Sequence, residues 1–104
     1  MHERVFQIIM RVPLGERKGQ ISFRQKGQKL EGTFEVMGNK NPFRGKMLSE
    51  TALEIEGVLL TIIRSIPFTA AGNIENRKLY MTLKEARHTY YIEGTEITEY
   101  EEIL

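Results

Sequence analysis

The chain has 104 residues and contains no cysteine, no tryptophan and no aspartate, so all 14 of its acidic residues are glutamates. Without cysteine the protein forms no disulfide bond and no thiolate metal site, which fits a cytoplasmic protein. The absence of aspartate disfavours nuclease-type and aspartyl-type catalytic sites. No segment approaches the roughly 18 apolar residues of a membrane-spanning helix. We therefore expect a cytoplasmic location and no membrane partner.

The length suits a single domain over residues 1–104, with room for one apolar core but little for a large cavity. The net charge is only +1, yet the charges are unevenly distributed. Basic residues dominate between Arg11 and Lys46, whereas residues 98–104 form an acidic C-terminal tail. This segregation is ordinary for solvated faces, but it also suits contacts between subunits or with an anionic partner.

Apolar and polar residues alternate along most of the chain, which is typical of half-buried strands. Residues 30–37 show the pattern best, because Leu30, Phe34 and Val36 share one face. Turns are predicted at Gly38–Pro42 and at Gly72–Asn73, where turn-forming residues gather. The pattern predicts an all-β protein whose seven or eight strands are joined by short loops, with strands over 4–12, 20–25, 30–37, 43–48, 51–55, 58–68, 74–84 and 88–97.

A short motif of an aliphatic residue, Glu, Gly and then Thr or Val recurs along the chain. It occurs at 30–33, 55–58 and 92–95, and a looser copy occurs at 43–46. In each copy the glycine lies two residues after an apolar residue, so it belongs to the inward face of a strand. Glycine inside a strand often marks a sharp bend or a close approach of backbones. We therefore predict an antiparallel up-and-down meander that curls into a closed or half-open small barrel; a flatter sandwich is the alternative.

The segments Leu30-Glu31-Gly32-Thr33-Phe34 and Ile92-Glu93-Gly94-Thr95 resemble strand motifs of the calycin-type small β-barrels, in the streptavidin-like and lipocalin-like groups. The resemblance implies an antiparallel barrel that often holds a small ligand at its mouth. This chain lacks the tryptophans that those barrels use in or beside the cavity, and it lacks the Gly-x-Trp start of lipocalins. The resemblance therefore carries over the barrel but no binding residue.

The interior of such a barrel offers one candidate site. Thr61, Ser65, His88 and Tyr90 are predicted to supply polar groups among phenylalanine and methionine side chains, and an apolar cavity with a few convergent polar groups is the usual form of a ligand site. The alternative is that side chains simply fill the interior, as they do in many barrels of about eight strands. We expect a small apolar or amphipathic ligand, or else an interaction module.

Segment Val58–Phe68 is apolar on both faces, whereas a small barrel buries only one. The second apolar face needs a cover, and the candidates are the C-terminal tail, with Ile103 and Leu104, and another subunit. We expect a homodimer formed through the Val58–Phe68 strand.

A second hypothesis is that the β-barrel binds single-stranded nucleic acid through a surface of basic and aromatic side chains. Tyr80 and Tyr91 are predicted on the outer face of adjacent strands, where aromatic rings can stack on bases. The basic residues around them are Arg77, Lys78, Lys84 and Arg87. A cross-strand pair of tyrosines that stabilises the sheet is the simpler explanation, and it makes a nucleic-acid partner the less favoured one.

Catalytic signals are weak. The two histidines, His2 and His88, have no metal-binding spacing, so we expect no metal and no cofactor. His88 is a third hypothesis, as the acid or base of an enzyme, because imidazole titrates near neutral pH. The glutamates alternate with apolar residues and are predicted to face solvent. The prediction is therefore a protein that is not an enzyme.

Overall fold

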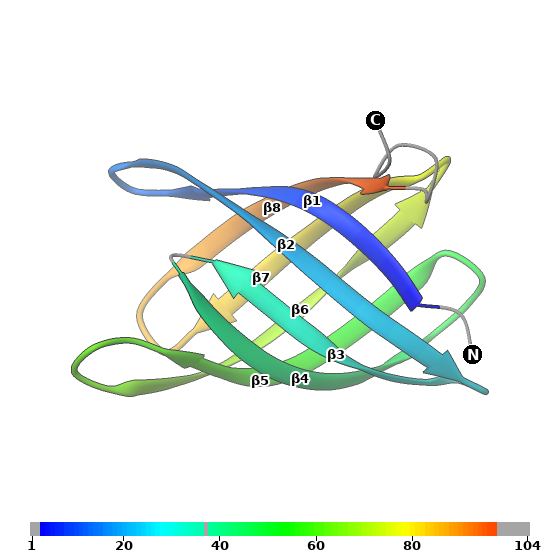
Figure 1. The fold of residues 1–104 in the computed structure, drawn as a ribbon, viewed down its shortest axis with the longest axis horizontal. Coiled ribbons are helices and arrows are strands. Elements are labelled where there is room, and N and C mark those ends of the chain that lie inside the picture. The colour runs from blue at the N-terminus through cyan, green and yellow to red at the C-terminus, as the bar shows by residue number, and fades with distance from the viewer. Residues whose placement is uncertain (1–2, 37, 98–104) are drawn as a thin grey trace.

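The computed structural model describes residues 3–36 and 38–97, which form eight strands. Each strand pairs antiparallel with the next, and β8 pairs with β1, so the sheet closes into an up-and-down barrel (Figure 1). This confirms the predicted fold class and the closed form of the barrel. The strands are β1 (Glu3–Val12), β2 (Gly15–Lys26), β3 (Lys29–Val36), β4 (Asn39–Met47), β5 (Ala52–Leu60), β6 (Ser65–Glu75), β7 (Lys78–Glu85) and β8 (Thr89–Ile97). In the described part of the chain, no helix is long and apolar enough to cross a membrane.

Large apolar side chains fill the barrel interior. Phe6 and Phe23 stack with their ring centroids 5.9 Å apart, and Phe34 meets Phe68 edge to face at 6.0 Å. Apart from the Val58–Phe68 segment and His88, the predicted inward faces are confirmed, because alternate residues of each strand are buried. Burial of this apolar surface is the main force that holds the barrel together. The fully buried apolar side chains are Phe6, Met10, Ile21, Phe23, Leu30, Phe34, Leu53, Leu79, Leu83 and Ile92.

The glycines of the repeated motif allow neighbouring strands to approach closely. A methyl carbon on Gly32 would lie 2.0 Å from the Ser22 carbonyl oxygen, and one on Gly45 would lie 2.1 Å from that of Glu54. Since no real carbon atom fits at such distances, the motif marks places where the sheet coils tightly. The close approach predicted from the sequence is confirmed.

The prediction of one Val58–Phe68 strand is wrong. β5 ends at Leu60 and β6 begins at Ser65, and the two form a hairpin. The Thr61 hydroxyl donates to the Arg64 carbonyl oxygen at 2.9 Å, which helps to hold the connecting loop. The apolar run therefore belongs to a loop tip and its flanking strands. The predicted homodimer was based on a strand that does not form, and the homodimer itself stays a prediction.

Two predicted turns are also wrong. β4 already begins at Asn39, so only the start of the Gly38–Pro42 cluster forms a turn, at Gly38 with φ of 80°. Gly72–Asn73 lies inside β6, and the chain turns later, at Asn76 and Arg77 with φ of 51° and 65°. In both segments, pairing with the neighbouring strands outweighed the local turn propensity. The acidic tail predicted over 98–104 lies outside the described residues.

Candidate ligand-binding site at the barrel mouth

The two ends of the barrel are built differently. At one end, Arg4 and Glu96 occupy inward positions on β1 and β8. Arg4 Nε lies 2.9 Å from Glu96 Oε2, and Arg4 Nη2 lies 2.8 Å from Glu96 Oε1. The guanidinium carbon also lies 5.3 Å from the centroid of the Phe6 ring. This two-point ion pair places two charged, partly shielded side chains at this end of the interior.

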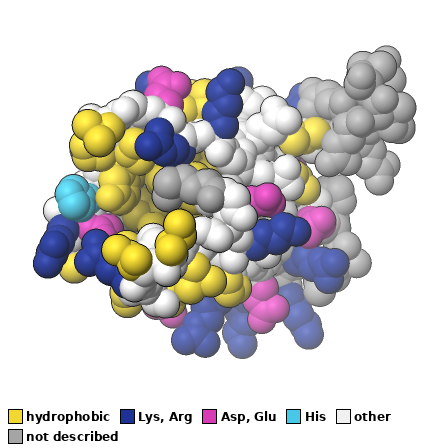
Figure 2. Space-filling view, turned by 60° about the vertical axis from the view of Figure 1, so that its left-hand side comes forward, with side chains coloured by type: hydrophobic (Ala, Val, Ile, Leu, Met, Phe, Trp, Pro, Cys, Tyr) yellow, Lys and Arg dark blue, Asp and Glu magenta, His cyan; other side chains and the backbone are white. Residues whose placement is uncertain are grey.

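The opposite end, here called the mouth, is surrounded by the β1–β2, β3–β4, β5–β6 and β7–β8 connections (Figure 1). Three inward-facing side chains there, those of Val12, Ile66 and Tyr90, are only partly buried and pack on the core. One layer deeper, Met10 and Phe68 are buried. Figure 2 turns this end toward the viewer and shows a hollow with hydrophobic side chains. The mouth is therefore a shallow apolar recess above a filled core.

A polar cluster lies at the edge of the mouth, on β7, β8 and their connection. Glu85 continues the inward face of β7, and its side chain is only 4% exposed. Its Oε1 accepts the Arg87 backbone N–H at 2.7 Å and lies 3.1 Å from His88 Nδ1. The His88 ring stacks on Tyr90 with centroids 5.9 Å apart. A carboxylate, an imidazole and a phenol thus gather beside the apolar recess.

The charges of this cluster are set by its hydrogen bonds and its burial. The Arg87 N–H, and then the His88 ring, hold the pKa of Glu85 below its ordinary value of 4.5. Burial, together with the Glu85 charge, raises the pKa of the Tyr90 hydroxyl above 10.0, and Arg64 opposes this shift. At neutral pH the cluster therefore offers an ionised acceptor at Glu85 and a neutral phenol at Tyr90. This combination suits the polar group of an amphipathic ligand.

The four residues predicted as ligand-binding come from the same end of the barrel. Tyr90 is half-buried, but Thr61, Ser65 and His88 are exposed. The predicted interior position is therefore wrong for these three, because Thr61 and Ser65 flank the tip of the β5–β6 hairpin and His88 lies in the β7–β8 connection. Their role in ligand binding stays a prediction.

Sequence reasoning missed Glu85 because the predicted strand ended at Lys84, which placed Glu85 in the tight connection that follows. A signal was present: Glu85 follows Leu79, Met81 and Leu83 with the same period of two, so it belongs to the inward face. Five other glutamates were predicted to face solvent: Glu31, Glu54, Glu56 and Glu93 are exposed, whereas Glu35 is half-buried.

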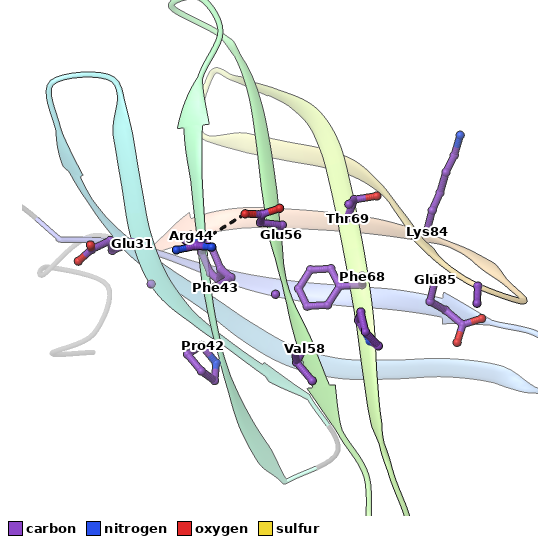
Figure 3. A pocket seen from close by; sticks show the side chains of 14 residues that line it. Glu31, Pro42, Phe43, Arg44, Glu56, Val58, Phe68, Thr69, Lys84 and Glu85 are labelled. Atoms are coloured by element: carbon purple, nitrogen blue, oxygen red, sulfur yellow. Dashed lines mark hydrogen bonds and ion pairs between the residues drawn. The ribbon is translucent and has the colours of Figure 1, made fainter.

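A second concave surface lies on the outside of the barrel (Figure 3). Strand pairing aligns outward side chains into two rows, and the concave surface lies between these rows. One row is polar and contains the ion pair between Arg44 Nε and Glu56 Oε1, at 3.2 Å. This surface is open, and Glu85 lines it as well as the edge of the mouth, but its other charged side chains are exposed. The mouth, where Glu85, His88 and Tyr90 gather, is therefore the stronger candidate. The rows are Glu31, Arg44, Glu56, Thr69 and Lys84, and Pro42, Val58, Pro67 and Ala86.

The residues of the nucleic-acid hypothesis extend along the whole of β7. Arg77 and Lys78 lie at one end and Lys84 and Arg87 at the other, with the exposed rings of Tyr80 and Tyr91 between them. The acidic Glu93 is the direct cross-strand partner of Tyr80 and forms an ion pair with Arg11. The two tyrosines therefore share the predicted outer face, but with an acidic side chain beside them.

Catalytic and metal chemistry have little support at the mouth. Within residues 3–36 and 38–97, no three His or Glu side chains gather in a group that could hold a metal ion. The Glu85–His88 pair is a possible acid–base pair, yet the ring of His88 is exposed at the rim and stacks on Tyr90. A binding role fits this arrangement better than proton transfer.

Comparison with known proteins supports the fold alone. No protein-family model matches the chain, and no curated protein matches it. Among solved structures, the chain is similar to a redesigned β-barrel, mFAP1, bound to DFHBI. The TM-score is 0.58 at 14% sequence identity, and the match covers 90% of this chain and 92% of the other. The predicted resemblance to small β-barrels is thus confirmed at the level of the fold.

Proposed function

We propose that this protein is a non-enzymatic binding protein that takes a small amphipathic ligand at the mouth of its barrel. The observation that carries the proposal is the apolar recess of Val12, Ile66 and Tyr90 beside the Glu85 carboxylate. The recess would hold the apolar part of the ligand, and the Glu85–His88–Tyr90 cluster would hold its polar group. Ligand sites commonly join an apolar lining to a few polar groups in this way.

Two further observations support the mouth over the barrel interior. The core below the recess is filled, so a ligand has room at the mouth but not deeper. At the other end, the Arg4–Glu96 ion pair places charged side chains at inward positions, which disfavours entry of an apolar group there. The similar redesigned barrel was solved bound to DFHBI, so a barrel of this topology can bind a small molecule.

The first test is native mass spectrometry of the protein purified gently from its host. We expect a species that carries an added mass of a few hundred daltons, on the scale of a small ligand. The same spectrum gives the number of subunits, which checks the predicted homodimer. A bare protein in every charge state, at the lowest activation energy, would argue against a retained ligand.

A second test uses the neutral dye Nile red, whose fluorescence rises at apolar surfaces. We expect Ile66→Arg to weaken dye binding by about tenfold, because it places a charge within the recess. Leu48→Arg is the matched control, since Leu48 is an exposed leucine outside the mouth. Equal binding by both variants would contradict a site at the mouth.

A further inference from the structure

Three apolar side chains project into solvent from two tips beside the mouth. Leu14, in the β1–β2 turn, is 92% exposed. Ile62 and Ile63, in the β5–β6 loop, are 101% and 87% exposed. Both tips extend from the same end of the barrel (Figure 1). A single exposed leucine needs no explanation, but consecutive isoleucines at one tip and a leucine at a second tip form a pattern. We call these three residues the apolar tips.

The apolar character continues from the tip of the β5–β6 hairpin along its outer side. Leu60 is exposed, and Val58 and Pro67 are cross-strand partners at outward positions further along the hairpin. The hairpin therefore presents apolar side chains outward for several residues behind Ile62 and Ile63. Such a surface is suited to partial insertion into an apolar phase rather than to a contact at a single point.

Basic side chains flank both tips. Arg17 and Lys18 follow the first tip in β2, Arg64 directly follows Ile63, and Arg87 lies in the β7–β8 connection. Figure 2 shows Lys and Arg side chains around the hydrophobic surface at this end. Apolar side chains surrounded by basic ones are typical of proteins that adsorb to anionic lipid surfaces, where apolar burial and electrostatic attraction add.

The glutamates near the tips do not cancel this positive charge. Glu16 pairs with Arg11, which also pairs with Glu93, and the Glu85 carboxylate turns inward, where it is 4% exposed. Among the described residues, no carboxylate forms an ion pair with Arg17, Lys18, Arg64 or Arg87, so these four exposed basic groups are available to an anionic surface.

We propose that the apolar tips dock the mouth of the barrel onto an anionic lipid surface. The tips enter the boundary between headgroups and acyl chains, and the four basic residues contact the headgroups. In this orientation the mouth faces the lipid. The expectation of no membrane partner rested on the absence of a spanning segment, which docking at a surface does not require. The docking does not depend on a ligand at the mouth.

The test is sedimentation of the intact chain with sucrose-loaded vesicles at low ionic strength. We expect binding to vesicles of phosphatidylcholine mixed with phosphatidylglycerol, and binding at least about tenfold weaker to phosphatidylcholine alone. Ile62→Ser/Ile63→Ser should weaken binding to the anionic vesicles by about tenfold or more. Arg64→Gln/Arg87→Gln should reduce it and also reduce its dependence on salt.

Matched controls lie at the other end of the barrel. Leu48→Ser removes an exposed leucine there, and Lys26→Gln/Lys29→Gln removes two basic groups from the β2–β3 turn. Both controls should bind anionic vesicles as the wild type does. Thermal unfolding of every variant checks that the barrel is folded, which is expected because all of these side chains are exposed.

Several outcomes would overturn the proposal. One is a wild-type protein that stays in the supernatant with anionic vesicles, and another is equal binding to both kinds of vesicle. A third is a dimer, seen by analytical ultracentrifugation, that Ile62→Ser/Ile63→Ser dissociates while no vesicle binding occurs, since the tips would then join two copies of the chain. If Ile66→Arg loses dye binding but still binds vesicles, then docking to lipid does not depend on the ligand site at the mouth.

Discussion

Arg4 and Glu96 join the first and last strands of the barrel through a two-point ion pair of 2.9 and 2.8 Å. Both side chains are largely shielded, at 30% and 15% exposed. The hydrogen bonds from Arg4 to Glu96, and then the Glu96 charge, raise the pKa of Arg4 against the opposing effect of burial, so the guanidinium is charged in the folded protein. The pair lies where β1 meets β8, and among the described strands this is the seam that joins segments distant in the sequence.

We predict that Glu96→Ala lowers the free energy of unfolding by about 1 to 3 kcal/mol, because it leaves a shielded guanidinium without its partner. Urea denaturation measures the change. The control is Glu56→Ala, which breaks the exposed Arg44–Glu56 pair, with side chains 81% and 60% exposed, and should cost less than about 1 kcal/mol. Equal losses from the two variants would show that the Arg4–Glu96 pair has no special role in closing the barrel.

We predict that Gly72→Ala destabilises the protein by at least about 2 kcal/mol. The new methyl carbon would lie 1.8 Å from the Tyr80 carbonyl oxygen and 2.7 Å from the Met81 Cα, so backbone would have to move. Gly94→Ala is the matched comparison, because its nearest atom, at 2.8 Å, belongs to the Ile8 side chain, which can shift. In thermal unfolding, Gly72→Ala should have a lower melting temperature than Gly94→Ala. The reverse order would contradict the close approach of β6 and β7.

We predict that Asn41→Ala weakens the junction between β4 and β5. Asn41 Oδ1 accepts the Leu60 N–H at 2.7 Å, and its Nδ2 donates to the Phe34 carbonyl oxygen at 2.9 Å. Removing the amide leaves these buried or part-buried groups unpaired, which should cost about 1 to 3 kcal/mol. Amide hydrogen exchange should accelerate at Leu60. Asn73→Ala, on an exposed position of β6, should leave that exchange rate unchanged.

We predict that part of the stability of the barrel depends on ionised Glu85. Because the folded-state pKa is lower than 4.5, this stabilisation is present above that value and is lost as the pH falls through the folded-state pKa. The stability difference between the wild type and Glu85→Gln should therefore shrink as the solution is acidified. Carbon-detected NMR titration of the Glu85 carboxyl gives the pKa directly. A midpoint above 4.5, or parallel stability profiles, would contradict the hydrogen bonds described at the mouth.

Much of the architecture could be predicted from the sequence, because the period of two is a local property of each strand. The inward positions of Phe34, Met81 and Ile92 followed from it directly. The glycine motif predicted the curvature for a similar reason, since a missing side chain signals that another backbone lies close. The boundaries of the β5–β6 hairpin could not be found in this way, because a continuous apolar run hides the loop within it.

The candidate site, too, could be predicted only in part from the sequence. The inward alternation, including that of Tyr90 and, by the same rule, Glu85, follows from local sequence. Three relations required the tertiary structure: the β7–β8 connection lies beside the β5–β6 hairpin, Arg4 and Glu96 pair at the opposite end, and Leu14 and Ile62 project from the same end. These relations join residues far apart in the chain, and they exist only once pairing of β1 with β8 closes the sheet. Local periodicity contains no information about that closure.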